Sequence, residues 1–219
     1  MRRVLFALVT GVISGQALAA DLLVPPPARA PVAFVVPPVF TWSGVYIGGN
    51  GGYSFGTTTP SIGGLNGAGF STNGIVAGGT MGGNYQTGAF VFGVEGDFDW
   101  DNIKGNPSVC VGCQVSSTWL ATARGRVGVA WDRLLFYGTG GVAFQNVKFA
   151  VTAPPLTTPL ATTIDAVGWT AGGGVEFAIS PNWSVKAEYL YVNFNNQTIG
   201  PGTFTLIENV VRGGVNYRF

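Results

Sequence analysis

The chain has 219 residues, a formal net charge of +1, only 10% charged residues, 35 glycines and a mean hydropathy of +0.34. Soluble domains usually carry about a quarter charged residues, and nucleic-acid binding normally needs a basic patch, so neither class is favoured. Histidine is absent, which removes histidine triads, histidine metal sites and the commonest general base. We therefore expect a non-enzymatic protein without a cofactor, a metal or a nucleic-acid partner.

The N-terminus has the three parts of a secretory signal. Arg2 and Arg3 form a short positive segment, residues 4–13 are apolar, and residues 17–19 read Ala-Leu-Ala. This pattern predicts a signal peptide over residues 1–19, cleaved after Ala19 or one residue later. The apolar run is too short to cross a bilayer as a helix, so an exported protein of this composition would insert through strands.

A proline-rich segment follows the signal. Residues 20–41 contain six prolines, which disfavour helix and central strand and predict an extended linker. The linker is either a periplasmic tether or a segment without a partner. The folded domain is predicted over residues 42–219.

Eight strands are predicted in this domain. They cover residues 45–55, 74–86, 90–101, 118–131, 134–151, 166–179, 183–193 and 208–219. Short turns at 87–89, 132–133 and 180–182 alternate with long loops at 56–73, 102–117, 152–165 and 194–207. That alternation is typical of an eight-stranded antiparallel up-and-down transmembrane β-barrel whose short turns are periplasmic. A soluble ligand-binding barrel or sandwich is the competing fold.

Side chains alternate along the predicted strands. In residues 90–101, Phe92, Val94 and Phe98 share one face and Glu95 and Asp97 share the other. The apolar face should meet lipid, because a lipid-facing charge near the midplane costs about 2–4 kcal/mol. Aromatic residues gather at both ends of the strands, as expected of two interfacial belts. The alternation in residues 134–151 breaks where two polar residues, 145 and 146, are adjacent, which predicts a β-bulge there.

The last strand ends the sequence with a phenylalanine. Tyr217 and Phe219 share its apolar face, and Arg212 and Arg218 share the polar one. The terminal phenylalanine resembles the C-terminal signature that the barrel-assembly machinery reads in bacterial outer-membrane proteins.

The start of the domain also carries a resemblance. The proline-rich segment followed by WSGVYIGGNGGY at residues 42–53, together with the signal and the last strand, resembles the alphaproteobacterial Omp25/Omp31-like outer-membrane β-barrel (porin-like) family. The resemblance implies a location in the outer membrane of a Gram-negative bacterium, with outer-membrane lipid and the assembly machinery as partners. It implies no particular molecular activity.

The polar faces predict a charged barrel interior. Acids and bases nearly balance there, and an eight-stranded barrel is just wide enough for side chains to fill it. The charges would form either a structural ion-paired plug or a narrow polar pore. The candidate residues are Glu95, Asp97, Asp99, Arg124, Arg126, Glu176, Lys186, Glu188 and Arg212.

Cys110 and Cys113, the only two cysteines, lie in the second long loop. The CxxC spacing suits a redox motif, half of a metal site or a small disulfide. Structural zinc would lack further ligands, and an exported compartment favours a loop disulfide.

Three functions are compatible with these features. The first is an outer-membrane barrel with a structural role in envelope integrity and surface-exposed loops. The second is a narrow porin-like channel for small polar solutes. The third, a surface ligand-binding protein, for example for haem, ranks lower because the chain has no histidine to serve as an axial ligand.

Overall fold

Eight long strands close into an antiparallel barrel in the computed structural model, which describes residues 40–62, 65–66, 69–105, 113–151, 160–199 and 202–219. Two-residue strands β2 (Leu65–Asn66) and β5 (Lys104–Gly105) accompany them. The long strands are β1 (Gly44–Ile62), β3 (Phe70–Thr87), β4 (Phe90–Asp101), β6 (Cys113–Trp131), β7 (Leu134–Val151), β8 (Leu160–Ala178), β9 (Trp183–Ile199) and β10 (Gly202–Arg218).

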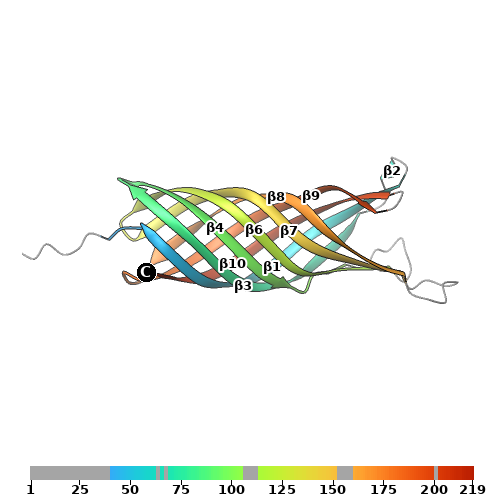
Figure 1. Cartoon of the computed structure of the whole chain (residues 1–219), viewed down its shortest axis with the longest axis horizontal. Coiled ribbons are helices and arrows are strands. Elements are labelled where there is room, and N and C mark those ends of the chain that lie inside the picture. The colour runs from blue at the N-terminus through green and yellow to red at the C-terminus, as the bar shows by residue number, and fades with distance from the viewer. Residues whose placement is uncertain (1–39, 63–64, 67–68, 106–112, 152–159, 200–201) are drawn as a thin grey trace, which may run out of the picture. The chain divides into compact units, whose positions relative to one another are not determined.

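Each long strand pairs with its neighbours in the chain, and β1 also pairs with β10, which closes the sheet. Figure 1 shows the strands running side by side with a common tilt. The predicted eight-stranded up-and-down barrel is therefore confirmed. The predicted signal peptide and residues 20–39 of the predicted linker lie outside the described residues.

The strands are longer than predicted at the end of the barrel away from the short turns. β4 and β7 have the predicted bounds, but β1 continues to Ile62, β8 begins at Leu160 and β9 continues to Ile199. The predicted long loops therefore included residues that belong to strands. Alternation of apolar and polar residues fades in these threonine-rich segments, yet backbone pairing with the next strand continues because it needs no apolar face.

The prediction of a bulge in residues 134–151 is wrong, because the bulge lies in the neighbouring strand β6. Ser117 of β6 pairs with Val147 of β7 and Leu120 pairs with Gln145, so two residues of β6 face only Asn146. Side chains of β7 alternate without interruption, with Gln145 and Val147 inside the barrel. The sequence pattern changes there because the polarity of the two faces inverts: the inside becomes apolar while Asn146 and Lys148 face outward.

Glycines on the two faces differ in their surroundings. A Cβ atom built on the inward Gly52 would lie 2.1 Å from the carbonyl oxygen of Val211, and one on the inward Gly172 would lie 2.1 Å from that of Tyr189. On the outward Gly49 and Gly213 the nearest atoms are 3.9 and 3.7 Å away. Inward glycines therefore allow the tight packing of the barrel wall, whereas the outward ones leave shallow hollows on its surface.

Candidate functional site: the charged layer of the barrel

The nine predicted interior charges all lie inside the barrel. None has more than 5% of its surface exposed. They come from β4, β6, β8, β9 and β10, and they face inward because strand alternation places every second residue on the inner face. We call this set of nine side chains the charged layer. It contains five carboxylates and four basic groups.

Arg124 joins three strands within the charged layer. Its Nη2 lies 2.6 Å from Glu95 Oε1 and also bonds Asp97 Oδ2, both on the adjacent strand β4. Its Nη1 donates to Glu188 Oε1 on β9 over 3.0 Å. The contact between Arg124 and Glu95 follows from the register of β4 and β6, in which these two residues are direct cross-strand partners.

Arg212 of β10 has a similar position on the other side of the lumen. Its Nη1 lies 2.8 Å from Asp99 Oδ2, and its Nη2 lies 2.9 Å from Asp97 Oδ1 and 2.6 Å from Glu188 Oε2. Asp97 and Glu188 thus each contact both arginines, because Arg124 bonds them too. The four groups form one continuous ion-paired cluster.

The remaining two basic groups complete the charged layer. Arg126 Nη2 lies 2.8 Å from Glu176 Oε2 on β8, and its Nη1 lies 3.4 Å from Glu95 Oε2. Lys186 Nζ lies 2.9 Å from the same Glu95 oxygen. Every member of the charged layer is therefore ion-paired. This satisfies the requirement that buried charges be paired, because an unpaired charge in a dry interior is strongly unfavourable.

Two tyrosines that were not predicted from the sequence belong to the same network. Tyr46 donates to Glu95 Oε2 over 2.7 Å and accepts from Arg126 Nη1 over 3.0 Å. Tyr137 donates to Glu188 Oε1 over 3.1 Å, and the Arg126 guanidinium lies 3.9 Å from its ring centroid. The sequence alternation that places Tyr46 and Tyr137 on the inner face of their strands could have indicated that they join this network.

An apolar layer lies at the short-turn end of the charged layer. We call it the lower layer, and it comprises Trp42, Val91, Ala130, Leu135, Tyr137 and Ala178. Trp42 is its largest member, with only 1% of its surface exposed. The Trp42 backbone N–H donates to Gln86 Oε1 over 2.7 Å, and its ring Nε1 donates to the Asp132 carbonyl over 3.2 Å. The Arg218 guanidinium lies 5.2 Å from the Trp42 ring centroid.

A second apolar layer, also not predicted, lies at the opposite end. We call it the upper layer, and it comprises Val76, Leu120, Ala143, Val147, Ala166, Leu190, Val192, Phe194, Leu206 and Val210. Glu208 lies at the same level; its Oε1 accepts from Gln145 Nε2 over 2.9 Å, and it makes no ion pair among the described residues. The charged layer is thus enclosed between two apolar layers.

The chemistry open to this interior is limited. Within the described ranges, no three or more histidine, cysteine, aspartate or glutamate side chains are grouped so as to hold a metal ion. The carboxylates of the charged layer are held by guanidinium, ammonium and hydroxyl groups. The arrangement suits rigid electrostatic cross-linking of the barrel wall.

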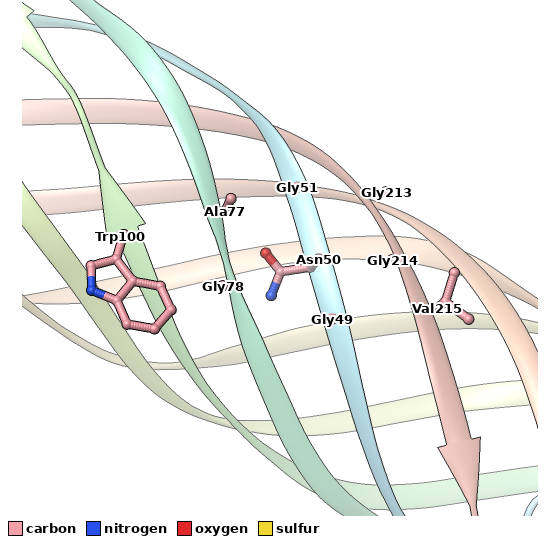
Figure 2. Close-up of a pocket in the computed structure, with 9 residues that line it drawn as sticks. All are labelled: Gly49, Asn50, Gly51, Ala77, Gly78, Trp100, Gly213, Gly214 and Val215. Carbon is pink, nitrogen blue, oxygen red and sulfur yellow. The ribbon is translucent and has the colours of Figure 1, made fainter.

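The described hollows lie on the outer surface of the barrel. Figure 2 shows one of them, between β10, β1 and β3, with Gly49, Gly51 and Gly213 beneath it and Trp100 at its edge. Its lining is mostly glycine, and Asn50 is the polar residue among the nine that line it. The hollow follows from the outward glycines and belongs to the surface predicted to face lipid.

That outer surface is apolar between two belts of exposed aromatic rings. Trp131 and Trp183 lie at the short-turn end, and Trp100 and Trp169 lie toward the opposite end. In the described residues, no helix is long and apolar enough to cross a membrane.

The other predicted residues are placed only in part. Tyr217 lies at the end of β10, with its ring centroid 5.1 Å from Trp183 and 5.2 Å from Phe219, so both predicted assembly-signal residues join the lower aromatic belt. Their role in assembly stays a prediction. Cys110 lies outside the described residues and Cys113 begins β6, so the loop disulfide also stays a prediction.

Comparisons with known proteins agree with this architecture. Residues 6–219 match the family model of the outer membrane protein beta-barrel domain. The 31 kDa outer-membrane immunogenic protein of Brucella melitensis is 33% identical over 242 residues, with all of both chains covered. The 22 kDa outer membrane protein of Rhizobium leguminosarum is 31% identical, covering 84% of this chain and 81% of the relative.

A 25 kDa outer-membrane immunogenic protein of Brucella canis is 29% identical over 94% of this chain and 92% of the relative. Among solved structures, OprG of Pseudomonas aeruginosa is similar with a TM-score of 0.49 and 10% identity, covering 82% of this chain and 99% of OprG. The matched relatives and the barrel together place the protein in the Gram-negative outer membrane. The chain therefore belongs to the outer membrane protein β-barrel family and is an outer-membrane protein of the Omp25/Omp31 type.

Proposed function

We propose that the protein is a structural barrel that contributes to envelope integrity and does not conduct solutes. The main support for this proposal is the arrangement of the interior, in which a fully ion-paired charged layer lies between the lower and upper apolar layers. Solute passage needs a continuous polar path. Here the path would have to cross two layers of packed apolar side chains, one of which contains Trp42.

The role follows from the exterior as well. Two aromatic belts hold the barrel at fixed depth in the bilayer, and the interior ion pairs stiffen its wall. If residues 20–39 act as a periplasmic tether, the barrel would anchor that tether at the membrane. The mechanism is mechanical, and we propose no catalytic role. Haem binding is not proposed, because the chain contains no histidine.

Conductance separates the structural barrel from the narrow pore. The refolded, purified protein is added to a planar bilayer, with a known porin as positive control and the boiled protein as negative control. We expect no discrete current steps at amounts at which the porin conducts. Reproducible steps would refute the closed barrel and would make Arg124, Arg126 and Glu95 the residues that determine ion selectivity.

The envelope role needs a test in cells. A deletion strain should become sensitive to detergent and to chelators, and the wild-type gene should restore resistance. A shortened variant that lacks residues 21–38 but retains the signal and the barrel separates the two parts. Full rescue by this variant would assign the role to the barrel alone, whereas a deletion strain that is as resistant as its parent would contradict the proposal.

A further inference from the structure

A row of polar side chains crosses the outer surface just beyond the upper aromatic belt. Cross-strand pairing places them side by side on five successive strands, since Lys104 pairs with Asn73 and Ser116, and Lys148 pairs with Ser116 and Thr163. All face outward, and all but the half-buried Ser116 are exposed. We call these five residues the lysine row.

The lysine row contains both exposed lysines of the described residues; Lys186, the third described lysine, is buried in the charged layer. Only one strand separates Lys104 from Lys148, so their backbones are about 10 Å apart. Neither lysine makes an ion pair among the described residues. With four-carbon stems, both ammonium groups can reach one anionic group lying over Ser116.

One acidic residue lies close to the row and must be considered. Asp165 is exposed on β8, two residues from Thr163, and its Oδ1 accepts from Asn146 Nδ2 over 3.0 Å. Because the two lysines outnumber this single aspartate, the local charge remains positive. The Asp165 carboxylate lies beyond Lys148 along the sheet, so it does not separate the two lysines.

An aromatic cluster lies directly below the lysine row, on the membrane side. Phe98 stacks on Trp119 with ring centroids 5.9 Å apart, and Trp100 meets Phe98 edge-on at 5.5 Å. Phe98 and Trp100 are 47% and 67% exposed, so their rings are available to a ligand. A positive row adjoining an apolar ring surface forms one continuous amphipathic patch.

We propose that this patch binds a phosphorylated lipid of the outer leaflet. The phosphate lies between Lys104 and Lys148, Asn73 and Thr163 offer hydrogen bonds beside it, and the acyl chains lie against Phe98, Trp100 and Trp119. Charge complementarity selects an anion, and the adjoining rings select an anion that carries apolar chains. A free anion would use only the upper half of the patch.

The inference rests on the outer-membrane location and is independent of whether the lumen is closed. The first test measures lysine protection. The full-length protein is placed in phosphatidylcholine nanodiscs with or without bisphosphorylated lipid A, and a water-soluble acylating reagent is added. Mass spectrometry gives the acylation rates of Lys104 and Lys148, which lipid A should lower. Unchanged rates would overturn the proposal.

Inorganic phosphate at matched concentration separates the two sources of the anion. If it protects both lysines as well as lipid A does, the site binds free phosphate and the lipid proposal is wrong. Little protection by inorganic phosphate is the expected result.

Variants supply the second test. Native mass spectrometry of the detergent-solubilised protein measures retained lipid A in wild type, in the double variant K104Q/K148Q and in D165N. The double variant should lose about thirtyfold in affinity, because each lysine near an anionic surface contributes about fivefold. D165N removes the nearby negative charge and should bind at least as well as wild type. Equal affinity of the double variant and wild type would contradict the proposal.

Discussion

Lys186 Nζ lies 2.9 Å from Glu95 Oε2 across the full width of the barrel. Lys186 is on β9 and Glu95 is on β4, and these strands are four positions apart in either direction around the closed sheet. The pair therefore joins opposite walls. Arg124, Arg126 and Tyr46 converge on the same glutamate, so Glu95 is the centre of the charged layer.

Removing Arg124 should destabilise the barrel strongly. R124A leaves the buried carboxylates of Glu95, Asp97 and Glu188 without one of their basic partners. Breaking a buried pair from one side costs about 3–5 kcal/mol. The urea midpoint, read from the mobility of folded and unfolded protein on unheated gels, should fall accordingly. R133A, in the exposed β6–β7 turn, is the control and should change little. An unchanged midpoint for R124A would argue against the network.

Glu208 and Glu188 should respond differently when each is replaced by glutamine. Glu188 bonds Arg124 and Arg212, so E188Q removes two ion pairs and should lower the urea midpoint. Glu208 lies in the upper layer with Gln145 as its closest polar contact at 2.9 Å, so E208Q removes a buried charge and keeps the shape. E208Q should leave the midpoint unchanged or raise it. A fall of equal size for both variants would contradict the difference described between their surroundings.

Trp42 should matter more than an equally large ring of the outer belt. W42A removes a ring that is 1% exposed, together with its hydrogen bond to Asp132, and a buried tryptophan-to-alanine change costs about 3–5 kcal/mol. The matched control is W131A, whose ring is 82% exposed. Thermal conversion from the folded to the unfolded gel band should shift much further for W42A. W42A should still produce no current steps in a planar bilayer, because its charged layer and upper layer are intact.

Two neighbouring glycines offer a test of the barrel wall. A Cβ on Gly52 would lie 2.1 Å from the Val211 carbonyl oxygen and 2.6 Å from the Arg212 backbone, whereas one on Gly49 meets nothing closer than 3.9 Å. G52A should therefore refold poorly. G49A should refold like wild type and be equally or slightly more stable, since alanine restricts the unfolded chain. The yield of heat-modifiable protein after refolding measures both, and similar yields would contradict the packing described for the wall.

Strand alternation in the sequence was enough to predict much of the site. Because the side-chain period of a strand is two, the positions of Glu95, Asp97 and Arg124 on a polar face followed from their neighbours alone. The same alternation predicted β4 and β7 with their observed bounds. The alternation failed as a guide beyond the upper aromatic belt, where polar side chains face outward and apolar side chains face inward. The bulge was therefore predicted in the wrong strand.

Local pattern also could not predict the layers of the interior. Val147 follows the predicted break in alternation and Phe194 falls in a predicted loop, yet both are buried in the upper layer. Trp42 is predicted only as the start of the domain, and its burial beneath Asp132 depends on a contact 90 residues away in the chain.

The sequence by itself determined that the nine side chains of the charged layer lie inside the barrel, because a charge that faces lipid near the midplane is too costly. Only the tertiary structure decided which of them pair across the lumen. Lys186 is the cross-strand neighbour of Glu176, yet its ion pair is with Glu95 on the opposite wall. The reason is that an eight-stranded sheet, once it closes into a barrel, brings opposite walls close enough for their side chains to meet. The diameter of the barrel and the tilt of its strands set this distance, and both are properties of the whole barrel and not of any one strand.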